Sequence, residues 1–281
     1  LENIFWVEKL LNISLIYKMA ENILEKIIEK KISKVNNLKK DITIDSLKDK
    51  IEEINSFINF KEKIENNIMS NKISIIAEIK KASPSAGVII KDYDPLKIAE
   101  IYKSNKATCL SVLTEEDFFF GNLSHISEIK KKINLPILCK DFFVDPFQIH
   151  LSKSYGADAI LIIIAGINDN LADKLYEEAL NLNMSVIVEV HTIDEAKKAL
   201  RFNDALIGIN NRNLKTLETE VSTTYKINDV LINHSGPLIS ESGIKTKDEL
   251  LEINKKTNIK TFLIGESLLR NLDKNSIFSI L

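Results

Sequence analysis

The chain has 281 residues, of which 44% are hydrophobic and 28% are charged, and it carries a formal net charge of −2. This composition indicates a folded globular protein with room for one α/β barrel or two smaller domains. The small net charge gives no general attraction to nucleic acid or to a membrane surface, and we expect neither as a partner. Cys109 and Cys139 lie in apolar runs, which argues against a disulfide framework and predicts a reducing, cytoplasmic compartment.

The N-terminal quarter of the chain has a helical pattern. Residues 1–20 lack the basic start and the cleavage site of a signal peptide, and we interpret them as a helical or disordered extension. Apolar residues recur at helical spacing from Ile23, and further helical segments begin near Asp45 and Phe60. We therefore predict helices over about residues 21–70. They would cover one end of the fold or help close the mouth of a site.

From Ser74 onward, short apolar runs alternate with amphipathic segments. Four or five consecutive apolar residues are typical of a strand buried on both faces, as in a parallel sheet. The predicted strands span about residues 74–79, 108–113, 136–140, 159–164, 185–190, 205–209, 237–241 and 261–264. The predicted helices between them are Pro95–Ser104, Leu123–Lys132, Pro146–Ser154, Asn170–Leu182, Ile193–Phe202, Val221–Ile232 and Lys247–Asn254.

One strand and one helix recur about every 25–30 residues, which is the spacing of a βα unit. Eight such units predict an α/β fold, a TIM (β/α)8 barrel with extra N-terminal helices. A doubly wound open sheet is the alternative, but the chain has no dinucleotide-type glycine loop, which favours closure. Residues 21–281 would then form a single domain. Thr192 and Thr246 are predicted N-caps of two helices.

The predicted strands end in side chains that can do chemistry, and in a barrel such strand ends converge on one site. Glu78 and Lys80 end the first strand and point to the same face. They form either part of an active site or an ion pair that closes the barrel.

Two further strand ends carry candidate acid–base residues. Lys140 ends the third strand, where a neighbouring carboxylate would keep it charged and make it a usable general acid, unless it simply extends to the rim. Glu189 ends the fifth strand and is a candidate general base. We favour it over the adjacent His191, because an isolated histidine in a loop is more often structural or exposed.

Other residues are suited to binding a substrate. Asn210 and Arg212 follow the sixth strand and can orient hydroxyls and a carboxylate, although asparagines also cap their own loops. Phe119, in the loop after the second strand, either flanks a planar ring or packs that loop. Ser83 lies in a turn-rich loop after the first strand and is a candidate contact for an anion.

An anion site is predicted where the seventh and eighth strands end, because these loops often bind phosphate in TIM barrels. Ser242 and Gly243 follow the seventh strand, and Gly265, Glu266 and Ser267 follow the eighth. A short helix beginning at Glu266 would direct its positive end towards the anion. The sequence has no cluster of His, Cys and Asp at metal-ligand spacing, so we predict no metal.

Taken together, these segments resemble the indole-3-glycerol phosphate synthase family of tryptophan biosynthesis. The resemblance covers residues from about 21 to the end and leaves out residues 1–20. The matching segments are IAEIKKASPS (76–85), LTEE (113–116), LCKDF (138–142), VEVH (188–191), IGINNRNL (207–214), SESGI (240–244) and IGESL (264–268). The resemblance implies a cytoplasmic TIM-barrel enzyme without a cofactor, which is a monomer or a weak homo-oligomer.

The reaction that the resemblance implies converts 1-(2-carboxyphenylamino)-1-deoxyribulose 5-phosphate into indole-3-glycerol phosphate by ring closure, decarboxylation and dehydration. Lys140 would be the general acid for ring closure and Glu189 the general base in dehydration. Lys80 would hold the substrate carboxylate or act as a second acid. Glu78 and Asn210 would fix hydroxyls and tune the lysines.

The resemblance also implies how the substrate is bound. Arg212 would face the carboxylate side and Phe119 would flank the aromatic ring. The phosphate end would be formed mainly by backbone N–H groups of Ser83, Ser242, Gly243, Gly265, Glu266 and Ser267.

Departures from the family pattern are few: Cys139 stands where Arg or Met is frequent, and Ala86 and Asp117 stand where Lys is frequent. Two other readings compete. Phosphoribosylanthranilate isomerase and the tryptophan synthase α chain share the barrel, but they leave the strand-end lysines Lys80 and Lys140 unexplained. The second competing reading is a catalytically inactive barrel used as a scaffold. The complete set of acid–base residues argues against it.

Overall fold

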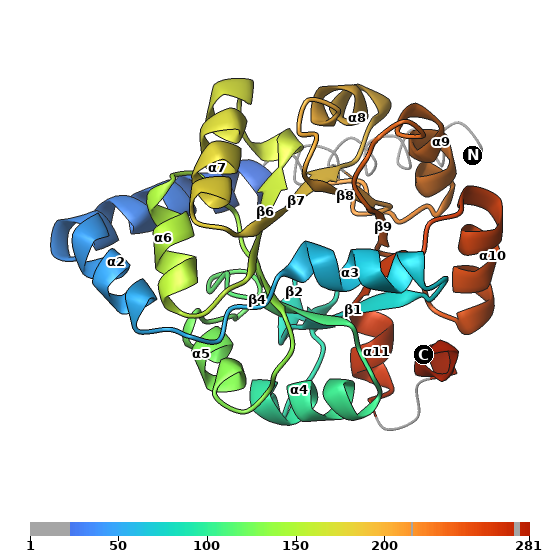
Figure 1. Ribbon diagram of the computed structural model, residues 1–281, viewed down its shortest axis with the longest axis horizontal. Coiled ribbons are helices and arrows are strands. Elements are labelled where there is room, and N and C mark those ends of the chain that lie inside the picture. The colour runs from blue at the N-terminus through green and yellow to red at the C-terminus, as the bar shows by residue number, and fades with distance from the viewer. Residues whose placement is uncertain (1–22, 215, 273–275) are drawn as a thin grey trace, which may run out of the picture.

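The computed structural model describes residues 23–214, 216–272 and 276–281 and contains a closed barrel of eight parallel strands (Figure 1). β1 pairs with both β4 and β10, which closes the sheet, so the open-sheet alternative is wrong. The expected extension over residues 1–20 lies outside the described residues. The barrel strands are β1 Ser74–Ile79, β4 Cys109–Leu113, β5 Ile137–Lys140, β6 Ala159–Ile163, β7 Ser185–Val190, β8 Leu206–Asn210, β9 Leu238–Glu241 and β10 Thr261–Ile264.

Helices follow the strands and surround the barrel (Figure 1). Thr192 and Thr246 are N-caps, as predicted, and each accepts a hydrogen bond from the backbone N–H three residues later. The helices are α4 Pro95–Ser104, α5 Ser124–Lys130, α6 Phe147–Ser154, α7 Asp169–Asn181, α8 Ile193–Ala199, α9 Ser222–Val230, α10 Lys247–Thr257 and α11 Glu266–Arg270, with 3₁₀ turns η1 Ile164–Gly166 and η2 Ser276–Ile280. None of the described helices is long and apolar enough to span a bilayer.

The strands are buried on both faces, which explains their continuous apolar runs. Their outward side chains pack against the helices, and their inward side chains form a second cluster inside the barrel. Phe60 and Ile64 of α3 (Phe60–Met69) belong to that inner cluster and are fully buried. Helix α3 therefore closes the end of the barrel where the strands begin.

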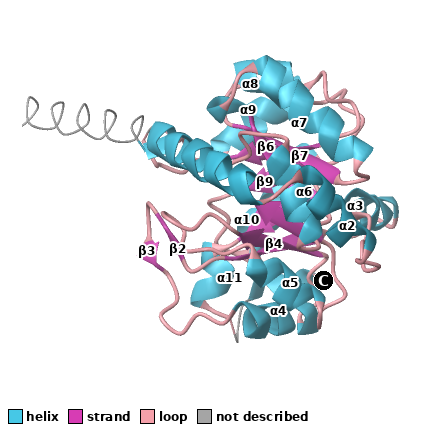
Figure 2. Cartoon of the chain, turned by 90° about the vertical axis from the view of Figure 1, so that its left-hand side faces the viewer, coloured by secondary structure: helices cyan, strands magenta, loops and turns pink. Residues whose placement is uncertain are grey.

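The first helix, described over residues 23–41, lies at the opposite end, on the same side of the barrel in Figure 2 as the small hairpin β2 Ala82–Ser83 and β3 Gly87–Val88. Its lysines pair with acidic residues in the loops after β4 and β5. Lys31 Nζ lies 2.6 Å from Asp141 Oδ1, and Lys34 Nζ lies 2.9 Å from Asp117 Oδ2. Helix α2 (Ile44–Glu52) then packs against α6. The N-terminal helices thus cover both ends of the barrel.

Candidate active site

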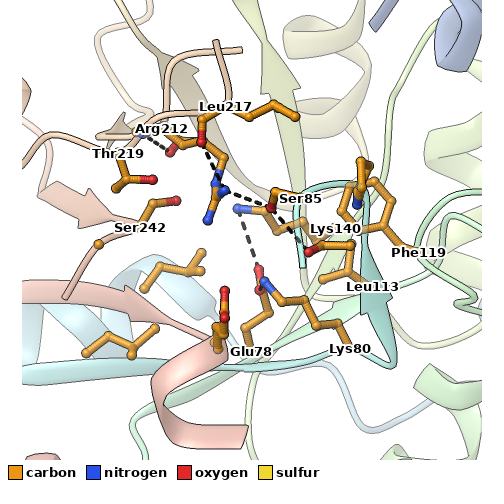
Figure 3. Close-up of a pocket in the computed structure, with 18 of the residues that line it drawn as sticks. Glu78, Lys80, Ser85, Leu113, Phe119, Lys140, Arg212, Leu217, Thr219 and Ser242 are labelled. Atoms are coloured by element: carbon orange, nitrogen blue, oxygen red, sulfur yellow. Dashed lines mark hydrogen bonds and ion pairs between the residues drawn. The ribbon is translucent and has the colours of Figure 1, made fainter. Parts of the chain in front are cut away.

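A cavity of about 770 Å³ opens at the C-terminal ends of the strands (Figure 3). The structure brings all the predicted site residues into its lining: Glu78, Lys80, Ser83, Phe119, Lys140, Glu189, Asn210, Arg212, Ser242, Gly243, Gly265, Glu266 and Ser267. These residues lie at the ends of seven of the eight strands or in the loops that follow them. The convergence follows from barrel closure, because parallel strands all end at the same rim.

Lys140 is the centre of the site. Its Nζ lies 2.7 Å from Glu241 Oε2, 3.3 Å from Glu189 Oε2 and 3.9 Å from Glu78 Oε2. Burial by itself would lower the pKa of Lys140, but the three carboxylates outweigh that effect and raise the pKa well above its usual value. The side chain therefore rests as a charged ammonium group.

Glu78, at the end of β1, contacts both Lys80 and Lys140. Its Oε1 lies 2.5 Å from Lys80 Nζ, and the ammonium groups of Lys80 and Lys140 hold the pKa of Glu78 below its usual value despite its burial. A Cβ added at Gly265 would lie 2.3 Å from Glu78 Oε1. Glycine at this position lets the loop after β10 approach the carboxylate. This packing role adds to the phosphate contact that the sequence predicts for Gly265.

Glu189 projects from the end of β7 and is held from three sides. Asn210 Nδ2 donates a hydrogen bond of 3.1 Å to Oε1, Lys140 approaches Oε2, and His191 Nε2 lies 3.1 Å from Oε1. Burial would raise the pKa of Glu189, but Lys140 and His191 lower it far below the usual range. His191 is neither exposed nor isolated, since its side chain is 6% exposed and touches Glu189.

Glu241 is a site residue that the sequence reading missed. It ends β9 opposite Asn210 and is 1% exposed, behind Lys140 rather than in the cavity lining. A Cβ at Gly208 would lie 2.1 Å from its Oε1, so that glycine makes room for the carboxylate. Burial raises the pKa of Glu241 to about 7, and the neighbouring carboxylates of Glu189 and Glu78 act in the same direction. Its position at a strand end was the available signal.

One side of the cavity is suited to an anion. Ser242 and Gly243 both adopt the left-handed conformation, with φ of 65° and 81°, which is a strained geometry for a serine. Ser267 Oγ donates to the carbonyl of Ile244, which ties the start of α11 to this loop. Arg212 lies between Ser242 and the Lys140 ammonium in Figure 3, with Nη1 2.8 Å from Ser85 Oγ.

The other side of the cavity is apolar. The rings of Phe119 and Phe142 lie 6.2 Å apart, and Leu24 and Ile27 of the first helix also contribute to the lining. Figure 3 places Phe119 across the cavity from Ser242. The site thus has an apolar wall, a charged centre and a polar end, in that order. Within the described ranges, no group of three His, Cys, Asp or Glu side chains is arranged to hold a metal ion.

Comparison with known proteins agrees with this geometry. The family model described as indole-3-glycerol phosphate synthase matches residues 24–280. The indole-3-glycerol phosphate synthase of Prochlorococcus marinus subsp. pastoris is 41% identical over 92% of this chain and 88% of its own length. That of Desulforamulus reducens is 39% identical over 89% of this chain and 93% of its own.

Among solved structures, tryptophan synthase subunit alpha from Legionella pneumophila superposes with a TM-score of 0.56 at 11% identity, covering 79% of this chain and 93% of that one. Similarity at that identity establishes the barrel fold and nothing more specific. The family model and the relatives carry the more specific conclusion. The chain belongs to the indole-3-glycerol phosphate synthase family.

Proposed function

We propose that this chain converts 1-(2-carboxyphenylamino)-1-deoxyribulose 5-phosphate into indole-3-glycerol phosphate, carbon dioxide and water. The observation that carries the proposal is the ammonium group of Lys140 among three buried carboxylates, between an apolar wall and an anion-binding end. The substrate has the same order of parts: an aromatic ring, a carbonyl that must be protonated, and a phosphate.

Ring closure needs an acid at the ribulose carbonyl oxygen, because protonation makes the carbonyl carbon electrophilic. Lys140 supplies that proton as the ring carbon bearing the carboxylate attacks. Carbon dioxide then leaves with the electron pair returning to the ring. In the following dehydration, Glu189 removes a proton from the methylene carbon next to nitrogen while an acid protonates the departing hydroxyl.

The remaining polar groups position these reactants. Lys80, paired with Glu78, either holds the substrate carboxylate or is the second acid. Asn210 orients Glu189 through its hydrogen bond to Oε1. Glu241 positions the Lys140 ammonium from behind, since it contacts Lys140 and lies outside the cavity lining.

Binding fixes the substrate at its two ends. The aromatic ring lies against Phe119, and Arg212 faces the carboxylate. The phosphate is held mainly by backbone N–H groups of Ser83, Ser242, Gly243, Gly265, Glu266 and Ser267. Anchoring both ends brings the ring carbon and the carbonyl carbon together, which removes most of the entropic barrier to cyclisation.

The compartment and the oligomeric state complete the proposal. The protein acts in the cytoplasm, which agrees with two buried free cysteines, Cys109 and Cys139. It works as a monomer or weak homo-oligomer on a small phosphorylated substrate. Sedimentation at micromolar concentration tests the second statement, and a stable large assembly would contradict it.

The central test replaces Lys140 by Met and measures indole product fluorescence. We expect turnover to fall by about 10²–10⁴-fold, the usual contribution of a positioned acid. The matched control is Lys130→Met, because Lys130 is also a buried lysine in an ion pair, 2.7 Å from Asp158, at the opposite end of the barrel. Turnover per folded molecule should be nearly normal in the control. Equal turnover in the two variants would contradict the assignment of Lys140.

A further inference from the structure

A line of contacts leads from the buried base Glu189 to the surface. His191 Nε2 lies 3.1 Å from Glu189 Oε1, and His191 Nδ1 lies 3.2 Å from Glu195 Oε2. Glu189 in turn lies 3.3 Å from Lys140 Nζ. The exposed fraction of the side chain rises from 4% for Glu189 to 6% for His191 and 18% for Glu195, so the line becomes more accessible towards α8.

The contact between His191 and Glu189 is an ion pair rather than an aligned hydrogen bond. Among the described residues, His191 Nε2 has no partner that meets hydrogen-bond geometry, although it is buried. A buried ring nitrogen directed at the catalytic carboxylate without a bond of its own is costly unless it is used. On the other side of the ring, the contact with Glu195 holds Nδ1 in place.

The proposed reaction takes up one proton in each turnover. The carbonyl oxygen leaves as water and needs two protons, and the methylene carbon next to nitrogen releases only one of them. The departing carboxylate supplies none, because it leaves as carbon dioxide. Glu189 can return the methylene proton to Lys140 across their 3.3 Å contact. One further proton must reach the buried centre from solvent before the next cycle.

We propose that His191, which Glu195 holds in place, starts a proton relay that recharges the Lys140 centre through Glu189. The inference rests on the proposed function, since the proton deficit follows from that reaction. His191 passes its Nε2 proton to Glu189, which passes a proton from its other oxygen to Lys140. The neutral ring keeps its Nδ1 proton against Glu195, and Nε2 regains a proton through Glu189 from water that enters the cavity after the product leaves. His191 and Glu195 act on the substrate only through Glu189 and are positioning residues.

The charges around His191 favour this direction. Burial would lower the pKa of His191, but the carboxylates of Glu189 and Glu195 outweigh it and raise the pKa to about 9, so the ring holds a proton at neutral pH. When Lys140 gives up its proton, the main positive charge opposing protonation of Glu189 is lost, and the neutral Lys140 amine binds a proton more strongly than His191 does, since its pKa is the higher of the two.

A purely structural explanation is available and must be tested. Glu195 caps α8, because its Oε2 accepts a 2.8 Å bond from the backbone N–H of His191. Helix α10 begins with a cap of the same geometry, in which the N-cap residue Thr246 has the same φ and ψ as Thr192, the N-cap of α8. There, Glu249 Oε2 accepts a 2.7 Å bond from the backbone N–H of Lys245.

The experiment compares Glu195→Gln with Glu249→Gln in the full chain. Both changes keep an oxygen that can accept the capping bond and remove one carboxylate charge. We measure kcat and KM for product formation from pH 6 to pH 10, together with the thermal unfolding temperature. A second variant, His191→Gln, keeps a hydrogen-bonding side chain but cannot take part in proton transfer.

In Glu195→Gln we expect the basic limb of kcat to move to lower pH by about one unit, since one of two carboxylates that raise the pKa of His191 is gone. At pH 8.5 to 9 this gives up to about a tenfold lower kcat, with KM within about twofold of wild type. His191→Gln should lower kcat at all pH values. Glu249→Gln should keep the wild-type profile.

Coincident kcat profiles for the two glutamine variants would overturn the relay, as would a pH-independent loss that follows the unfolding temperature. These outcomes are distinct from failure of the proposed function. If wild-type protein makes no indole product at any pH, the proposed function itself fails. If wild-type protein is active and the variants coincide, only the relay fails.

Discussion

Replacing Glu241 by Gln tests how catalysis and stability are linked in this site. Glu241 Oε2 lies 2.7 Å from Lys140 Nζ, and its Oε1 has no hydrogen-bond partner in the part of the chain that the structure describes. Glutamine keeps the size of the side chain and an oxygen acceptor for the ammonium group but removes the charge. We expect the variant to be more stable than wild type at pH 8 and at least about 100-fold slower, because Lys140 loses its nearest carboxylate.

The stability effect follows from the pKa of Glu241, which burial raises to about 7 in the folded protein. The pKa of a glutamate in an unfolded chain is about 4.3. A carboxyl group with a raised pKa destabilises the fold wherever it is ionised in both states, so the cost is complete above about pH 7 and fades as the pH falls towards 4. The upper limit is roughly 3–4 kcal/mol at pH 8 and about 1 kcal/mol at pH 5.

Urea unfolding at the two pH values measures this difference directly. Burial of the glutamine amide costs a similar amount at both, so it cancels, and the gain at pH 8 should exceed that at pH 5 by about 2 kcal/mol. For a chain of this size that corresponds to roughly 4–8 °C in unfolding temperature. An equal change at both pH values, or a loss of stability at pH 8, would refute the reasoning.

Two further variants test other parts of the site. Gly265→Ala should displace Glu78, because the new Cβ would lie 2.3 Å from Oε1. We expect about 1–3 kcal/mol less stability and a lower kcat, and an unchanged kcat would show that Glu78 can move without consequence. Lys31→Met breaks the buried pair with Asp141 and should cost up to about 3–5 kcal/mol and raise KM more than it lowers kcat, as the first helix loosens. The exposed Lys197→Met is its control, expected within about 0.5 kcal/mol of wild type in urea unfolding; equal losses in the two would argue against the anchoring role.

The elements of the barrel were predictable because each one is encoded locally. A strand buried on both faces must be apolar throughout, so its ends are visible where the run meets a charged residue, as at Lys140 and Glu189. Helix starts are similarly local, since Thr192 and Thr246 cap their own helices. Closure then followed from the number of units, and closure alone brought the strand ends together.

The contacts that tune the site were not predictable, because they join residues far apart in the chain. Lys140 and Glu241 are 101 residues apart, and nothing near either one indicates that they touch. His191 was undervalued for the same reason, as its importance comes from the direction of its ring towards Glu189. The apolar wall formed by the first helix depends on the pair between Lys31 and Asp141, which has no local signature.

The raised pKa of Lys140 opposes proton donation to a neutral carbonyl, because a strongly held proton is a poor one to donate. The acceptor resolves the difficulty. As the ring carbon attacks, the carbonyl oxygen becomes alkoxide-like, and an alkoxide binds a proton far more strongly than a neutral carbonyl does. A donor with a high pKa is then well matched to the oxygen at the moment of bond formation, and it keeps its proton until that moment. In the proposed mechanism, the three carboxylates around Lys140 would therefore prevent early proton loss and attract the replacement proton once transfer has occurred.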